Sequence, residues 1–108
     1  MSAEDHYLDA IEKLDSGDRD SALEHAYKAV KLDPEHVDAW HVISDAHLMA
    51  DGKPANLIDA SKSLSAVKKI VELDPTRIDI WVRGGRLLAD ELGLMFDALE
   101  WWQKVRHH

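Results

Sequence analysis

The chain contains no cysteine, so neither a disulfide framework nor a thiolate-bound metal can hold its fold together. It has only 5 glycine and 3 proline residues, most of them at breaks in a helical pattern, and aromatic residues make up 6% of it. No apolar run approaches the roughly 18 residues that a membrane-spanning helix needs. Burial of side chains must therefore supply the stability of the fold.

Positive charge is also scarce: the chain has 13 Lys and Arg residues against 21 Asp and Glu residues, so its net charge is −8. An acidic surface repels nucleic acids and anionic membranes, and we expect neither as a partner. A hydrophobic content of 45% is ordinary for a globular protein and argues against disorder. Residues 1–5 lack the features of a signal peptide, so we expect a soluble, cytoplasmic protein.

One phrase occurs twice in the chain. The segment VKLDPEHVDAW at residues 30–40 returns as VELDPTRIDIW at residues 71–81, a constant offset of 71 − 30 = 41. In both copies Leu-Asp-Pro is followed by a tryptophan six residues after the proline. A repeat at a fixed period is typical of a stacked-repeat protein, which works through its surface and needs no catalytic pocket.

Hydrophobic periodicity predicts six helices paired as three hairpins, with no strand. In the first helix the apolar residues Tyr7, Ala10, Ile11 and Leu14 follow the i, i+3, i+4, i+7 spacing of one helix face. The pattern is interrupted at five places, namely Asp15–Asp18, Asp33–Pro34, Asp51–Pro54, Asp74–Pro75 and Gly93. We therefore expect one all-α domain over residues 1–108, with units at approximately 3–34, 35–75 and 76–108.

Two helix starts show the spacing of a capping box. Ser2 precedes Asp5 by three residues at the first helix, and Thr76 precedes Asp79 by three at the fifth. Each pair predicts reciprocal hydrogen bonds between a side chain and the free backbone N–H groups of the helix start.

The three units resemble the tetratricopeptide repeat (TPR), a hairpin of two antiparallel helices in 34 residues. The first-helix pattern is matched by Trp40, Ile43–Ser44, Trp81, Gly84–Gly85 and Leu88. The second-helix pattern is matched by Ala22, Ala26, Ala29, Leu32, Pro34, Ala98, Trp102 and Val105. The resemblance implies a right-handed superhelical stack of hairpins, an α-solenoid, that binds protein partners.

Three spacings depart from the family pattern. The middle unit is 41 − 34 = 7 residues longer than a TPR. Because seven residues are close to two helical turns, we expect longer third and fourth helices and a turn at Asp51–Pro54 that projects from one edge. Tyr7 to Ala22 is one residue shorter than the family spacing, and Trp81 to Ala98 is one residue longer. Gly85 occupies the small position of the motif, but nothing in the pattern explains Gly84.

The first helix of each TPR hairpin lines the concave, ligand-binding groove. Carried over to this chain, the resemblance places seven residues there: Glu12, Asp38, His41, Asp45, Met49, Arg83 and Arg86. This mixture of signs suits a peptide with both charged and apolar side chains. We interpret the chain as a non-catalytic adaptor or assembly scaffold for a protein or peptide partner.

Enzymatic and metal-binding functions are not indicated. The sequence has no glycine-rich phosphate loop and no recognisable nucleophile-base arrangement. Asp38, His41 and Asp45 share a helix face, but an i to i+7 spacing covers about 10.5 Å, too far for one ion. We therefore expect no enzyme, no cofactor and no metal site.

The last helix is apolar on more than one face. We expect Trp102 to pack inside its own hairpin and Met95, Phe96 and Trp101 to be exposed. An exposed apolar patch usually marks an interface. The alternative function is therefore a structural unit that forms homodimers through this helix, with no dedicated groove ligand.

Overall fold

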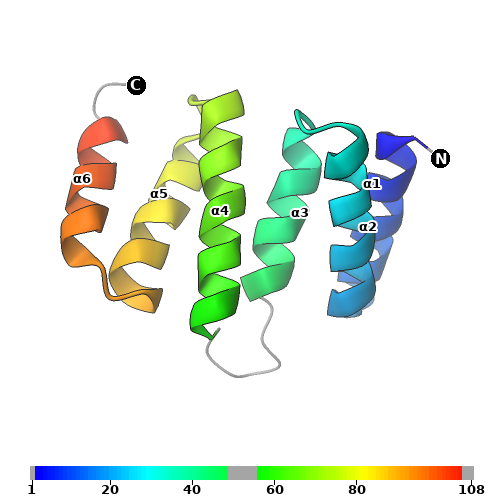
Figure 1. Ribbon diagram of the computed structural model, residues 1–108, viewed down its shortest axis with the longest axis horizontal. Coiled ribbons are helices and arrows are strands. Elements are labelled where there is room, and N and C mark those ends of the chain that lie inside the picture. The colour runs from blue at the N-terminus through cyan, green and yellow to red at the C-terminus, as the bar shows by residue number, and fades with distance from the viewer. Residues whose placement is uncertain (1, 49–55, 106–108) are drawn as a thin grey trace.

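The computed structural model describes residues 2–48 and 56–105, which form six α-helices and one π-helical turn with no strand in those ranges (Figure 1). The elements are α1 (Ala3–Asp15), α2 (Arg19–Leu32), α3 (Val37–Leu48), α4 (Leu57–Leu73), α5 (Ile78–Arg86), η1 (Leu87–Glu91) and α6 (Met95–Val105). The predicted all-α stack of hairpins is confirmed. Met49 and the predicted turn at Asp51–Pro54 lie outside the described residues.

The molecule measures 41 × 31 × 18 Å along its principal axes. Along the longest axis the three hairpins follow one another in the order α1–α2, α3–α4, α5–α6. We call the face formed by α1, α3 and α5 the first-helix face, and the opposite face, formed by α2, α4 and α6, the second-helix face (Figure 1). Each unit buries its apolar side against its neighbour, as expected for a stack of repeats.

The core forms two clusters, one at each junction between units. The cluster between the first and second units is rich in alanine, with Ala10, Ala26, Ala29, Ala39 and Ala66 fully or almost fully buried. Small side chains let these helices approach closely. The cluster between the second and third units is built from larger side chains, including Leu64, Ile70, Ile80, Trp81, Leu88 and Trp101.

The repeated phrase makes the same bond in both copies. The indole Nε1–H of Trp40 donates to the carbonyl of Pro34 over 2.8 Å, and that of Trp81 donates to the carbonyl of Pro75 over 2.8 Å. Proline ends the preceding helix because it cannot continue the helical hydrogen bonding. The tryptophan then ties the start of the next helix to that break, so the phrase has a structural role.

Only one of the two predicted capping boxes forms. Ser2 Oγ accepts the backbone N–H of Asp5 at 3.2 Å, and the backbone N–H of Ser2 donates to the Asp5 carboxylate at 3.0 Å. The prediction at Thr76 is wrong, because α5 begins one residue later with Arg77 as its N-cap. The Thr76 hydroxyl instead donates to the Asp74 carboxylate at 2.6 Å.

The extra length of the middle unit appears in α4. Its counterpart α2 begins at Arg19, which corresponds to residue 19 + 41 = 60, yet α4 begins 60 − 57 = 3 residues earlier. The described part of α3 spans 12 residues. The remaining extra residues of the middle unit belong to the segment 49–55 of the sequence, which lies outside the described residues.

The single extra residue between Trp81 and Ala98 is accommodated by the π-helical turn η1. There the backbone N–H of Leu92 donates to the carbonyl of Leu87, five residues earlier, at 2.9 Å. A π turn takes up one residue more than an α turn. Gly93 follows with φ +67°, a left-handed conformation that suits glycine and ends the helix.

The predicted exposure of Trp101 is wrong. Trp101 is only 7% exposed, its Nε1–H donates to the carbonyl of Trp81 at 2.6 Å, and the two rings lie 4.8 Å apart. Trp102 is the more exposed of the pair, at 36%. The cause is Gly84, since a Cβ there would lie 2.6 Å from Trp101 Cε2. The absence of a side chain at Gly84 lets the Trp101 ring enter between α5 and α6.

Candidate protein-interaction site

Three predicted site residues meet at the centre of the first-helix face. Asp45 on α3 lies between His41, whose Nδ1 is 3.0 Å from Asp45 Oδ2, and Arg83 of α5, whose Nη1 is 2.5 Å from Asp45 Oδ1. His41 and Asp45 are one helical turn apart on α3, so they share a face. We call His41, Asp45 and Arg83 the Asp45 cluster.

The surroundings of Asp45 keep it ionised. Partial burial opposes ionisation, but the hydrogen bond from His41 and the positive charge of Arg83 outweigh burial and hold the pKa of Asp45 below its usual 3.8. Arg83 also donates to the hydroxyl of Ser44 at 3.2 Å. Ser44 Oγ in turn lies 2.8 Å from Ser63 Oγ on α4, in the buried core. The cluster is therefore anchored to all three helices of this junction.

The other predicted residues are not drawn together. Glu12, Asp38 and Arg86 are exposed and form no ion pair with any residue that the structure describes. Two exposed apolar side chains also come from the first helices, Leu8 at 55% and Val82 at 42%. The first-helix face thus has an ordered ionic centre, and separate charges and apolar side chains lie elsewhere on α1, α3 and α5.

A second polar network joins α2 to α4 on the other side of the stack, and the sequence did not predict it. Arg19 Nη2 lies 2.5 Å from Asp59 Oδ1, which also lies 3.0 Å from His47 Nδ1. The hydroxyl of Tyr27 is 2.9 Å from His47 Nε2. Burial opposes ionisation of Asp59, but His47 and Arg19 together hold its pKa below the usual 3.8. We call Arg19, Tyr27, His47 and Asp59 the α2–α4 network.

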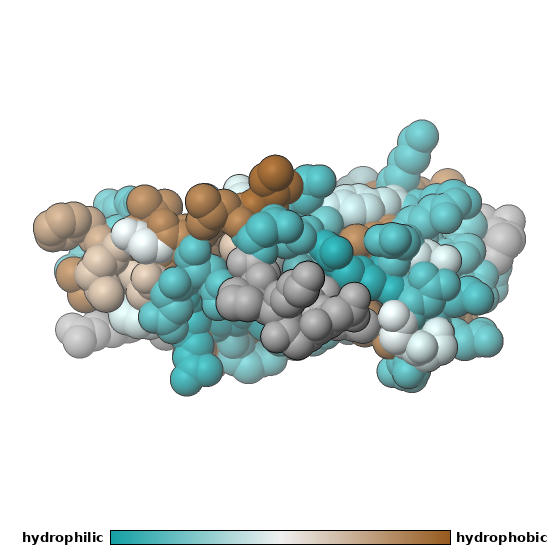
Figure 2. Space-filling model, turned by 90° about the horizontal axis from the view of Figure 1, so that it is seen from below, coloured by the Kyte–Doolittle hydropathy of each residue, from teal (hydrophilic) through white to brown (hydrophobic). Residues whose placement is uncertain are grey.

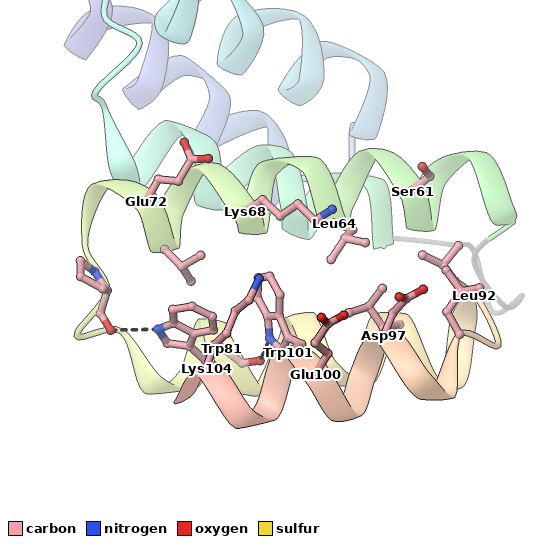
Figure 3. Close-up of a pocket in the computed structure, with 14 residues that line it drawn as sticks. Ser61, Leu64, Lys68, Glu72, Trp81, Leu92, Asp97, Glu100, Trp101 and Lys104 are labelled. Carbon is pink, nitrogen blue, oxygen red and sulfur yellow. Dashed lines mark hydrogen bonds between the residues drawn. The ribbon is translucent and has the colours of Figure 1, made fainter. Parts of the chain in front are cut away.

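An open cleft of about 910 Å³ lies between α4 and α6, also unpredicted. Its apolar lining consists of Leu64, Val71, Pro75, Trp81, Leu88, Leu92, Leu94 and Trp101. Its polar lining consists of Ser61, Lys68 and Glu72 from α4 and Asp97, Glu100 and Lys104 from α6. Figure 3 shows Trp81 and Trp101 side by side in the cleft, with charged side chains of α4 and α6 flanking them.

Apolar side chains also gather at the edge of the stack where α4 begins and α5 turns into α6, which is the lower edge in Figure 1. Leu57 is 66% exposed, Ile58 69%, Leu94 45%, Met95 54% and Phe96 89%. Seen from this end, hydrophobic groups lie in the half toward α6 and hydrophilic ones dominate the half toward α1 (Figure 2). We call these five residues the apolar end. The expected exposure of Met95 and Phe96 is therefore confirmed.

Comparison with known proteins identifies the fold. The crystal structure of the MamA protein, which contains TPRs, superposes with a TM-score of 0.79 and 19% sequence identity. The fold is TPR-like. The match covers 96% of this chain and 52% of that chain, so this TPR-like chain spans about half of the MamA structure, and 20 solved chains match in all. No family model and no curated protein sequence matches it.

The described residues contain neither a metal-binding group nor a membrane-spanning helix. Across residues 2–48 and 56–105, no group of three or more His, Asp or Glu side chains could hold a metal ion. No helix in the same ranges is long and apolar enough to cross a membrane.

Proposed function

We propose that this chain is a non-catalytic protein-interaction module, an adaptor or assembly scaffold, that binds a peptide or protein segment on its first-helix face. The observation that carries the proposal is the Asp45 cluster, which holds His41 and Arg83 in fixed positions while each side chain stays about 30% exposed. Polar groups that are ordered before binding lose less entropy when a ligand docks.

The charges around the Asp45 cluster indicate the kind of segment that would bind. Arg86 lies on the same helix as Arg83 and suits a ligand carboxylate, whereas Glu12 and Asp38 suit a ligand amine or guanidinium. Val82 of α5 and Leu8 of α1 add exposed apolar contact area. The face therefore fits a segment that carries both signs of charge and at least one apolar anchor.

Selection from a random peptide library on the immobilised chain tests the proposal. We expect the selected peptides to lose at least about tenfold in affinity, roughly 1.4 kcal/mol, on Arg86→Glu. The matched control is Lys62→Glu, which makes the same charge change at an exposed position of α4. Peptides that bind wild type, Arg86→Glu and Lys62→Glu equally well would show that the first-helix face is not the binding site.

A second candidate function is self-association through the apolar end. It is supported by the exposure of Phe96 at 89% and Met95 at 54%, since contiguous exposed apolar side chains usually mark an interface. Light scattering across a range of concentrations should show a dimer that Phe96→Glu converts to a monomer. A wild-type protein that stays monomeric at the highest concentration would exclude this function.

A cytoplasmic location of the protein remains a prediction.

A further inference from the structure

The internal repeat allows the two junctions between units to be compared position by position. The repeated phrase relates α2 and α3 to α4 and α5 by 41 residues, so Tyr27 corresponds to Lys68 and His47 to Leu88. Buried Ala22, Ser63 and Ala98 occupy the same motif position, which relates α4 to α6 by 98 − 63 = 35 residues. Asp59 therefore corresponds to residue 59 + 35 = 94, a leucine.

At the first junction the α2–α4 network bridges the two second helices. The phenol ring of Tyr27 contacts the imidazole of His47 edge-on, with ring centres 6.0 Å apart and a hydroxyl-to-Nε2 distance of 2.9 Å. Asp59 binds the other nitrogen of His47 and the guanidinium of Arg19. Two rings and an ion pair thus connect the helices of this junction.

At the second junction the corresponding residues leave the space open. Lys68, Leu88 and Leu94 stand where Tyr27, His47 and Asp59 stand in the first junction, and all three line the cleft of about 910 Å³. No ring stands at the position that corresponds to Tyr27, and Trp81 and Trp101 line the opening with the small parts of their rings that are exposed (Figure 3). Water over the apolar part of this lining has few hydrogen-bond partners there, so displacing it by an apolar group is favourable, while the polar side chains stand at the rims.

We propose that the cleft between α4 and α6 is a docking site for an aromatic side chain of a partner protein. The occupant is a ring because the matching space of the preceding junction holds the phenol ring of Tyr27 against a ring partner. The site lies on the second-helix face, away from the Asp45 cluster. It goes beyond the function proposed above and does not depend on whether the first-helix face binds a peptide.

The rims of the cleft indicate that the ring belongs to a peptide segment. Lys68 and Glu72 come from α4, and Glu100 and Lys104 from α6, with no ion pair across the cleft in the part of the chain that the structure describes. Both signs of charge are therefore present on both rims. A segment lying lengthwise between the helices can pair its polar groups with these rims while its ring enters the apolar interior.

A peptide series tests the proposal on the full chain. The probes are Gly-Ser-Gly-X-Gly-Ser-Gly peptides with Tyr, Phe, Leu or Ala at X, together with p-cresol as a free ring, and the readout is the indole N–H resonances of Trp81 and Trp101. We expect saturable shifts with Tyr and Phe, at least tenfold weaker binding with Leu, and no saturable shift with Ala.

Lys68→Tyr is the decisive variant, because it supplies at the second junction the ring that Tyr27 supplies at the first. It should abolish the shifts, and Ser61→Trp, at another lining position, should also block the cleft. Lys62→Tyr, on α4 but outside the lining, should leave binding unchanged. The proposal is overturned if the Tyr peptide causes no saturable shift, if the shifts persist in both blocking variants, or if p-cresol binds and no peptide does.

Discussion

A methyl group added at Gly85 tests whether the close approach of α6 to α5 determines the stability of the third unit. A Cβ at this position would lie 2.7 Å from Cζ2 of Trp102 and closer still to Nε1 and Cε2 of the same ring. In Gly85→Ala the Trp102 ring must therefore move. Since this ring is 36% exposed, it can move toward solvent, although it then loses its contact with α5.

The expected change in the free energy of unfolding of Gly85→Ala is the sum of two opposing effects. Alanine in place of a mid-helix glycine favours the helix by about 1 kcal/mol. Overpacking costs about 1–3 kcal/mol, so we expect Gly85→Ala to destabilise the protein by about 0–2 kcal/mol. In a Trp102→Ala background the overlap is gone, and the same substitution should stabilise the fold by up to about 1 kcal/mol. The expected coupling between the two positions is thus about 1–3 kcal/mol.

Urea unfolding followed by far-ultraviolet circular dichroism measures all four members of this double-mutant cycle. Equal m-values across the cycle would show that the extent of unfolding is unchanged. If Gly85→Ala has the same effect in both backgrounds, the Trp102 ring does not limit the space at Gly85 and the reasoning is refuted. Gly84→Ala should cost more than Gly85→Ala, because buried Trp101 is held by its hydrogen bond to Trp81 and cannot swing out.

Two further predictions concern single hydrogen bonds and charges. Trp40→Phe keeps a six-membered aromatic ring but removes the five-membered ring whose N–H donates to Pro34, and calorimetry should show a loss of stability of at least about 0.5–1.5 kcal/mol; no loss would mean that this bond does not stabilise the fold. The folded-state pKa of Asp59 lies below 3.8, so its contribution to stability is present well above pH 3.8 and is lost as the pH falls through the folded-state value. Urea titrations at decreasing acid pH should therefore show a steeper decline in wild type than in Asp59→Asn, and identical profiles would contradict the assignment.

The first-helix residues show how far a resemblance to a family can predict which side chains share a face. It placed His41, Asp45 and Arg83 on one face, and the structure brings these three side chains together. It could not show that Asp45 binds Arg83 as well as His41, because Arg83 is 38 residues away along the chain. Glu12 and Arg86 stay apart from the cluster, and their role in binding remains a prediction.

The sequence by itself determined the helices and the breaks between them. Periodicity, the two proline breaks and the Ser2 capping box act over a few residues, so their effects can be predicted from neighbours along the chain. The same local reasoning failed at Thr76, where Asp74 competes for its hydroxyl.

Only the tertiary structure decided which side chains meet between helices. It buries Trp101 over Gly84 and leaves Trp102 half exposed, although the two are neighbours in one helix. It also bridges the first junction with the α2–α4 network, whose Arg19 and Asp59 are 40 residues apart, and leaves a cleft at the second. These differences depend on how two helices approach each other in space, and helical periodicity specifies the buried face of a helix but not the partner it meets there.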